Sequence, residues 1–177
     1  MKGGRKNLYT EQELARILSE YGKSVYRLAF IKTKNYSDAD DIYQEVFLRL
    51  IKNDKEFKSD EYLKNWLLKT TINLCKDLWK SAWYRNNSLL SDFQEDSGYE
   101  YESVNEKDDE SSEVTNAVMQ LPQKYREVIH LYYYEGYTEK EIAQMLNTNE
   151  KTISSRMLRG RKKLKELFEK EGKKYEF

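Results

Sequence analysis

The sequence predicts an all-α protein made of two small helical domains joined by a flexible acidic linker. Apolar residues recur at three- and four-residue steps along most of the chain, which is the spacing of a buried helix face. A single proline and 7 glycines among 177 residues favour long helices with few turns. Between these helical stretches lies a segment too poor in aliphatic residues to form a core. We expect an N-terminal domain over 10–85, the linker over 86–112 and a C-terminal domain over 113–172.

The overall composition indicates a cytoplasmic protein and gives no net charge from which to infer a partner. Lys plus Arg and Asp plus Glu both number 31. The mean hydropathy is -0.95, and no apolar run approaches the length of a membrane span or the core of a signal peptide. We therefore expect no membrane insertion. The one cysteine, Cys75, excludes an internal disulfide and suits a reducing compartment.

The same composition leaves little material for catalysis or metal binding. One histidine and one cysteine leave little material for a zinc site. His130 is expected to be a partly exposed helix residue, because no acid–base partner or nucleophile signature surrounds it. We expect no enzyme activity, no cofactor and no metal.

Three helices are predicted in the N-terminal domain. Thr10 and Glu13 form a capping box that starts the first helix, Ser37 is expected to cap the second, and the third begins near Ser59. Residues at helical spacing form the expected inner stripes: Leu14, Ile17, Tyr21, Val25 and Leu28, then Ile42, Val46 and Leu50, then Leu63, Leu67, Thr70, Leu74 and Leu78.

Carboxylates crowd the N-terminal half of the second helix, at Asp38, Asp40, Asp41 and Glu45. The simplest explanation is the favourable interaction of acids with the positive end of a helix dipole. A nuclease-type metal site is a second possibility, since Asp41 and Glu45 share a helix face. No second cluster of carboxylates or histidines completes a two-metal site, so we disfavour it.

Aromatic and basic residues alternate near the end of the third helix. Trp66 lies near the apolar stripe, whereas Trp79, with Trp83 and Tyr84, is expected to lie off it, among Lys76, Lys80 and Arg85. Exposed rings among cations favour single-stranded nucleic acid, at roughly 1–3 kcal/mol per stacked base. A satellite hydrophobic cluster under the linker explains this segment equally well.

The linker is acidic and the C-terminal domain begins after it. Lys107 is the only base between Asn86 and Glu113, against ten acids, so self-repulsion should extend the linker. A short helix over 113–121 follows, and Pro122 occupies the first position of the next helix. That helix aligns Tyr125, Val128 and Tyr132 on its inner face and stops at Gly136.

The sequence of residues 137–164 predicts a helix-turn-helix. Thr138 and Glu141 form a capping box, Asn147 tolerates the left-handed turn, and Asn149 caps the second helix. That helix turns Ile153, Met157 and Leu164 inward, and Lys151, Ser155 and Lys162 outward with Arg159 beside them. The alternative is an ordinary helical hairpin with a solvated basic face. Cations over several turns, with Thr152, Ser154 and Ser155 in the first turns, favour DNA binding.

Several of these motifs resemble bacterial extracytoplasmic-function (ECF) sigma factors, subunits of RNA polymerase. Residues 38–48, DADDIYQEVFL, resemble the family's DAxDxxQExFL helix, and residues 66–77 its WLxxIxxNxxxD helix. Leu121-Pro122 and the segments 125–128, 135–138 and 141–143 match the start of its C-terminal domain. Residues 152–161 resemble its TVxSRLxRAR recognition helix. Asn147 replaces a usual Gly, and Gly160 replaces a usual Ala, which should loosen the helix by about 0.5–1 kcal/mol.

The resemblance implies a subunit that directs core RNA polymerase to promoters. Asp41, Gln44 and Glu45 would bind the clamp helices of the polymerase's largest subunit. The melted −10 element would lie against Asn73, Lys76, Asp77, Trp79 and Lys80. The −35 duplex would be read by Thr138, Lys151, Thr152, Ser154, Ser155, Arg156, Arg159, Lys162 and Lys163. The family also implies contacts with other polymerase subunits and an anti-sigma factor. A free-standing helix-turn-helix regulator is the alternative within DNA binding.

Overall fold

The computed structural model describes residues 9–54, 56–86, 109–170 and 172, leaving out the side chains of 82–86 and 109–113. These residues form seven α-helices and no strand, which confirms the all-α prediction. The chain divides into two compact units, Met1–Ser88 and Leu89–Phe177, each of which has its own core. Most of the predicted linker, residues 87–108, lies outside the described residues.

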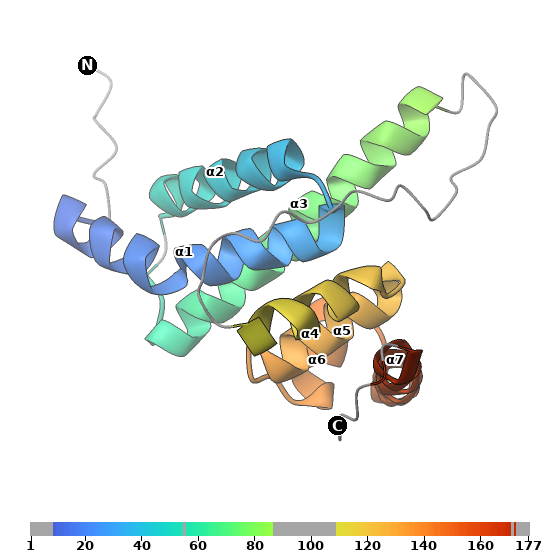
Figure 1. Ribbon diagram of the computed structural model, residues 1–177. Coiled ribbons are helices and arrows are strands. Elements are labelled where there is room, and N and C mark those ends of the chain that lie inside the picture. The colour runs from blue at the N-terminus through green and yellow to red at the C-terminus, as the bar shows by residue number, and fades with distance from the viewer. Residues whose placement is uncertain (1–8, 55, 87–108, 171, 173–177) are drawn as a thin grey trace, which may run out of the picture. The chain divides into compact units, whose positions relative to one another are not determined.

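Three helices that contact one another build the first unit: α1 (Glu11–Thr33), α2 (Tyr36–Lys52) and α3 (Asp60–Asn86) (Figure 1). The capping box that starts α1 is confirmed. The Thr10 hydroxyl accepts from the Glu13 amide at 3.2 Å, and the Glu13 carboxylate accepts from the Thr10 amide at 2.7 Å. The second of these bonds is the main cause of the lowered pKa of Glu13. Val25, Leu28, Val46, Leu50, Leu67 and Ile72 are completely buried between the helices.

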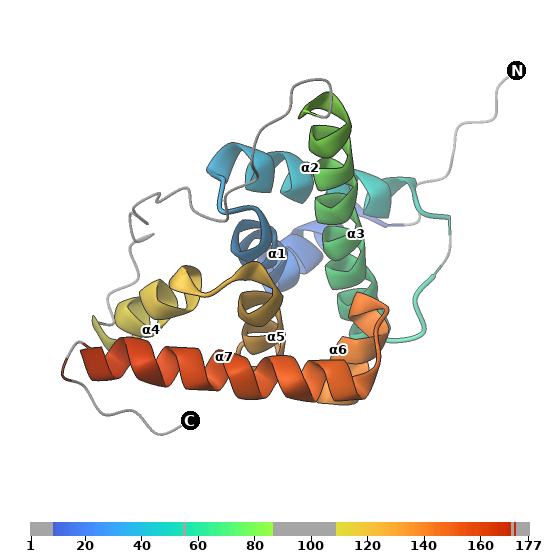
Figure 2. The same cartoon turned by 90° about the vertical axis from the view of Figure 1, so that its right-hand side faces the viewer.

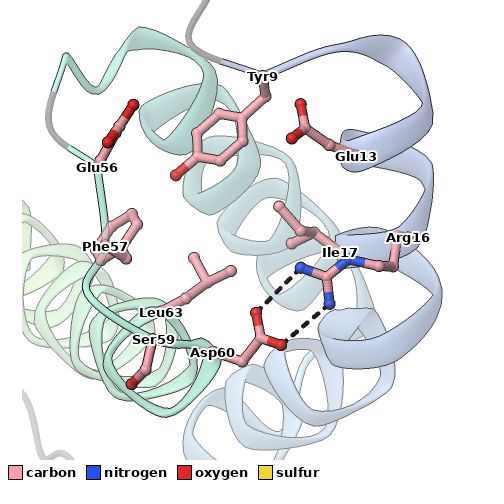
Figure 3. A pocket seen from close by; sticks show the side chains of 9 residues that line it. All are labelled: Tyr9, Glu13, Arg16, Ile17, Glu56, Phe57, Ser59, Asp60 and Leu63. Carbon is pink, nitrogen blue, oxygen red and sulfur yellow. Dashed lines mark hydrogen bonds and ion pairs between the residues drawn. The ribbon is translucent and has the colours of Figure 1, made fainter.

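The N-terminal ends of α1 and α3 are joined by an ion pair beside a small cavity (Figure 3). The Arg16 guanidinium donates to both carboxylate oxygens of Asp60, at 3.0 and 3.3 Å, and to Glu20 at 2.9 Å. The cavity, of about 260 Å³, is also lined by Tyr9 and Phe57. Since both side chains are exposed to solvent, which screens the charges, the pair adds little to the stability of the unit. The buried helix faces hold the unit together.

The predicted start of α2 is wrong by two residues. Asn35, and not Ser37, is the N-cap, and its side-chain oxygen accepts from the Asp38 amide at 3.0 Å. Lys34 adopts the left-handed conformation (φ 53°) and ends α1, so the chain re-enters a helix almost at once. The inner stripe of Ile42, Val46 and Leu50 is confirmed, since all three are buried.

The inner stripe predicted for α3 is partly wrong. Leu63 and Leu67 are buried as expected, but Thr70, Leu74 and Leu78 are only half-buried. The buried face instead continues through Leu68, Thr71, Ile72 and Cys75. The three-residue step from Leu67 to Thr70 rotated the predicted stripe away from the face that α1 and α2 cover. Thr71 tolerates burial because its hydroxyl donates to the Leu67 carbonyl at 2.9 Å.

Four helices build the second unit: α4 (Asp109–Gln120), α5 (Gln123–Tyr133), α6 (Glu139–Leu146) and α7 (Glu150–Lys170). The long α7 contacts the other three and runs along one side of them (Figure 2). Residues 109–112, expected in the linker, are already helical. Pro122 is the N-cap of α5, with an extended ψ of 141°, and not the first helical residue as predicted. The helix therefore begins one residue later, at Gln123.

A buried arginine joins α4 to α5. Arg126 is 3% exposed, and its Nη1 donates to the carbonyls of Leu121 at 2.8 Å and Met119 at 3.3 Å. Met119 lies in the last turn of α4 and Leu121 just after it, where backbone carbonyls lack partners within the helix. Burial lowers the pKa of Arg126 to about 10, with the carboxylate of Glu127 opposing the shift, so the side chain stays charged at neutral pH.

The inner face of α5 also differs from the prediction at two positions. Tyr125 and Val128 are buried, but Tyr132 is 36% exposed and His130 is 2% exposed. The helix lies among α4, α6 and α7, so every residue from Tyr125 to Leu131 is buried and no single stripe describes it. His130 Nε2 lies 3.5 Å from a carboxylate oxygen of Glu135. Burial beside an acid replaces the expected solvent contact.

The α5–α7 contact depends on Gly160. A Cβ atom at this position would lie 3.2 Å from Ile129 Cγ1 and 3.4 Å from Tyr125 Cβ. Gly160 is therefore more than a weak helix former, because the absence of a side chain lets α7 approach α5 closely. The contact fixes how α7 lies on the unit, and with it the direction of its outward face.

We expect Gly160→Leu to lower the free energy of unfolding of the second unit by about 1–3 kcal/mol through overpacking against Ile129. Gly160→Ala should change it much less, because a gain of about 1 kcal/mol in helix propensity offsets the crowding. Urea unfolding followed by far-UV circular dichroism measures the change. Tryptophan fluorescence, which reports only the first unit, should be unchanged. A leucine variant as stable as the parent would contradict the close approach.

Candidate nucleic-acid interface

The predicted helix-turn-helix consists of α6, a tight turn and α7. The Thr138 hydroxyl accepts from the Glu141 amide at 3.3 Å, and the Glu141 carboxylate accepts from the Thr138 hydroxyl at 2.7 Å and its amide at 2.8 Å. These bonds to Thr138, the side-chain one first, lower the pKa of Glu141. Asn147 ends α6 in the left-handed conformation (φ 54°, ψ 54°). The Asn149 side chain accepts from the Thr152 amide at 2.8 Å. All three capping predictions are confirmed.

The two faces of α7 are divided as the sequence predicts. Ile153, Met157 and Leu164 are at most 1% exposed and pack inward. The side chains of Lys151, Ser155, Arg159, Lys162 and Lys163 are exposed. A long helix that presents cations over three turns can follow a DNA groove while its inner face stays fixed.

Two of the three predicted DNA-contacting hydroxyls on α7 already donate within the protein. The Thr152 hydroxyl donates to the Asn149 side chain at 2.8 Å, and the Ser154 hydroxyl donates to the Glu139 carboxylate. Both protons are therefore used in closing the turn between α6 and α7. In the described part of the chain, the Ser155 hydroxyl has no such acceptor, which leaves it able to donate to an outside group.

The cations of α7 also differ in their availability. Arg156 lies 3.6 Å from the carboxylate of the nearly buried Glu127. Arg161 donates to the Tyr133 hydroxyl at 2.9 Å and lies over the rings of Tyr132 and Tyr133, each 5.7 Å away. Among the described residues, no carboxylate pairs with Lys151 or Arg159. These two side chains can bind an anion without first breaking an internal contact.

One exposed apolar residue on α7 was missed by the sequence analysis. Leu158 is 70% exposed, immediately before Arg159 and one turn after Ser154 and Ser155. An isolated leucine at an outward position of a basic helix was the available signal, because it does not belong to the inner stripe. Such a side chain can contact the methyl group of thymine in the major groove.

In the first unit, Trp79 does not lie off the buried stripe as predicted. It continues the face of Ile72 and Cys75 and is half-buried. The buried Lys32 places its ammonium 5.3 Å from the centre of the Trp79 ring. Asn73, Asp77 and Lys80 are exposed on the neighbouring outward face, with Lys76 half-buried beside them. The side chains of Trp83, Tyr84 and Arg85 lie outside the described residues.

The acidic positions predicted to bind polymerase lie on the outer side of α2. Asp41 and Gln44 are exposed, while Glu45 accepts from Arg49 at 2.8 Å, which lowers the pKa of Glu45. Leu48 follows on the same side and is 46% exposed. The described residues contain no group of three His, Cys, Asp or Glu able to hold a metal ion. This surface combines acids with an exposed leucine, and its carboxylates could pair with a positively charged surface of a protein partner.

Comparison with known proteins identifies both units. Residues 17–85 match the family model described as Sigma-70 region 2, and residues 111–164 match the model described as Sigma-70, region 4. The chain is 26% identical to the RNA polymerase sigma factor SigV of Bacillus subtilis, over 94% of this chain and 98% of that protein. It is 28% identical to the ECF RNA polymerase sigma factor SigW of the same species, over 88% of each.

Solved structures share the fold. The sigma factor RpoE of Bartonella quintana, solved with the anti-sigma factor NepR, gives a TM-score of 0.69 at 20% identity, covering 89% of this chain and 98% of that one. CnrH, solved with the cytosolic domain of CnrY, gives 0.59 at 21% identity, covering 90% of each. Two helical units that match the models of Sigma-70 regions 2 and 4 define a protein of the sigma-70 type. This chain belongs to the ECF sigma factors, RNA polymerase subunits that direct transcription from specific promoters.

None of the described helices is long and apolar enough to cross a membrane.

We expect Trp79→Ala to lower the free energy of unfolding of the first unit by about 1–3 kcal/mol, less than the roughly 3–5 kcal/mol of a fully buried tryptophan. The remaining tryptophans also lie in this unit, so their fluorescence during urea unfolding measures the change. Lys80→Ala, at an exposed neighbouring position, is the matched control and should unfold like the parent. A Trp79 variant of unchanged stability would show that the ring adds nothing to the core.

Proposed function

We propose that α7 reads the −35 element of the promoter as duplex DNA. The observation that carries this proposal is the exposed face of α7. There, Lys151 and Arg159 pair with no carboxylate of the described residues, and the Ser155 hydroxyl has no acceptor among them. Lys162 and Lys163 extend the face toward the phosphate backbone, and Leu158 offers an apolar contact to a thymine. Thr138, Thr152 and Ser154 take part through the turn that they hold in shape, and Arg156 through its remaining positive charge.

We also propose that the first unit binds core polymerase and holds the opened −10 element. Asp41 and Gln44, with Glu45 and the exposed Leu48, form the surface of α2 for the clamp helices of the largest subunit. Asn73, Lys76, Asp77 and Lys80 lie on one face of α3, with the Trp79 ring at its edge. The Lys32 ammonium lies over the Trp79 ring. A base of the opened strand would therefore stack on the part of the ring that Lys32 does not cover.

We infer a cytoplasmic protein that is held inactive by an anti-sigma factor. This inference is supported by RpoE, a protein of the same fold that was solved with the anti-sigma factor NepR. An anti-sigma factor would act by covering surfaces that polymerase or DNA requires.

Transcription by reconstituted polymerase tests the function as a whole. Core polymerase with this chain should start transcripts at a small set of promoters, and sequencing the 5′ ends should reveal shared −35 and −10 elements. Core polymerase alone is the control. A free-standing regulator would give transcripts only when another sigma subunit is present, and that result would contradict the proposal.

We expect Arg159→Ala to weaken holoenzyme binding at the −35 element by about 1–3 kcal/mol and to reduce discrimination at one base pair. Arg161→Ala is a matched control and should lose less, since Arg161 is engaged by two tyrosines. Gel-shift titrations on promoters with single base changes measure both quantities. Unchanged binding to specific and random duplex would remove Arg159 from the interface, whereas an even loss across sequences would indicate a phosphate contact.

Reversal of Asp41 and Glu45 to lysine should weaken assembly with core polymerase, because it replaces carboxylates on the outer side of α2. Reversal of the exposed Glu11 and Glu61 changes the net charge equally and serves as the control. Fluorescence anisotropy of a labelled chain titrated with core polymerase gives the affinity. Thermal unfolding should be similar for both pairs. Assembly of the Asp41 and Glu45 variant at the parent affinity would exclude α2 as the docking surface.

A further inference from the structure

A cavity of about 380 Å³ lies between the N-terminal end of α5 and the first turns of α7. Four cationic side chains line it: Lys124 from α5, and Lys151, Arg156 and Arg159 from α7. No role is predicted for Lys124 from the sequence, because it lies outside the helix-turn-helix. The fold places it beside the recognition helix, across from residues more than two dozen positions later in the chain.

The charges around this cavity are unequally compensated. Glu127 lies 3.6 Å from Arg156 and offsets part of its charge. In the described part of the chain, no carboxylate pairs with Lys124, Lys151 or Arg159. The cavity therefore has a net positive lining from three free cations and one partly neutralised one. The Ser155 hydroxyl adds a donor, whereas the Thr152 proton is used by Asn149.

Lys124 is also held in place before any ligand binds. Its ammonium lies 5.3 Å from the centre of the Tyr125 ring, and Tyr125 itself is only 7% exposed. A cation over a fixed aromatic face loses less freedom on binding than a freely extended lysine. The exposed ammonium remains free to interact with an anion.

We propose that this cavity holds one backbone phosphate of the −35 duplex, with Lys124 as a ligand from outside the helix-turn-helix. A phosphodiester has two charged oxygens, which suits converging ammonium and guanidinium donors from two helices. Such a contact carries no sequence information but fixes the register of α7 on the duplex. The inference rests on the proposed −35 function and adds the site at which the backbone is anchored.

The test replaces single −35 phosphates by neutral methylphosphonates and measures closed-complex affinity of the reconstituted holoenzyme. With the parent chain, one position should lower affinity by about tenfold, the size of one charge-assisted contact. Lys124→Gln on unmodified DNA should lose a similar factor. Combined, the two changes should cost no more than either alone. Lys165→Gln, which removes an exposed charge elsewhere on α7, should keep the full methylphosphonate effect.

The outcomes separate this proposal from the function on which it rests. A parent holoenzyme without −35 specificity would refute the proposed function. A specific parent whose methylphosphonate effects all persist in Lys124→Gln would refute the phosphate site alone. Inorganic phosphate should displace DNA from the parent more than chloride of equal ionic strength does, and Lys124→Gln should remove that difference. A difference that persists in Lys124→Gln would overturn the assignment of the phosphate to this cavity.

Discussion

The second unit depends on the close approach of α5 and α7 at Gly160. Because no side chain separates Gly160 from Ile129 and Tyr125, the recognition helix lies directly on α5. That contact sets which residues of α7 face outward and brings Lys124 beside its first turns. Arg126 in turn holds α4 against α5, because its guanidinium donates to the carbonyls of Met119, in the last turn of α4, and of Leu121 just after it. The exposed face of α7 that we propose to bind DNA is therefore positioned by all four packed helices and not by two helices alone.

Many polar residues that a motif would assign to DNA also serve the protein itself. Thr152 and Ser154 donate their protons within the turn, and Glu127 holds Arg156. These bonds keep side chains at the interface in one arrangement, which reduces the ordering cost of binding. Trp79 in the first unit likewise has an internal partner, because the Lys32 ammonium lies over one side of its ring. Residues that we propose to bind a partner are therefore interleaved, along α7 and α3, with residues that hold these surfaces in shape.

The parts of the fold that depend on neighbours in the chain were predictable. The caps at Thr10, Thr138 and Asn149 and the left-handed Asn147 follow from side-chain chemistry within three residues. The buried face of α3 and the burial of His130 were not, because they depend on which other helices cover each side. A prediction from helical periodicity assumes that one face of a helix is buried, whereas α5 is buried around most of its circumference. The division of α7 into inward and outward residues was predictable, but the internal partners of Thr152, Ser154 and Arg156 were not. Lys124 lies too far away in sequence for spacing to connect it with α7.

The burial of the single thiol has a practical consequence. Cys75 is completely buried in the face of α3 that α1 and α2 cover, so it should resist alkylating reagents while the first unit stays folded. Its labelling rate would then report how often α3 separates from its neighbours. A thiol probe could follow that opening in the intact holoenzyme, without introducing any substitution into this chain.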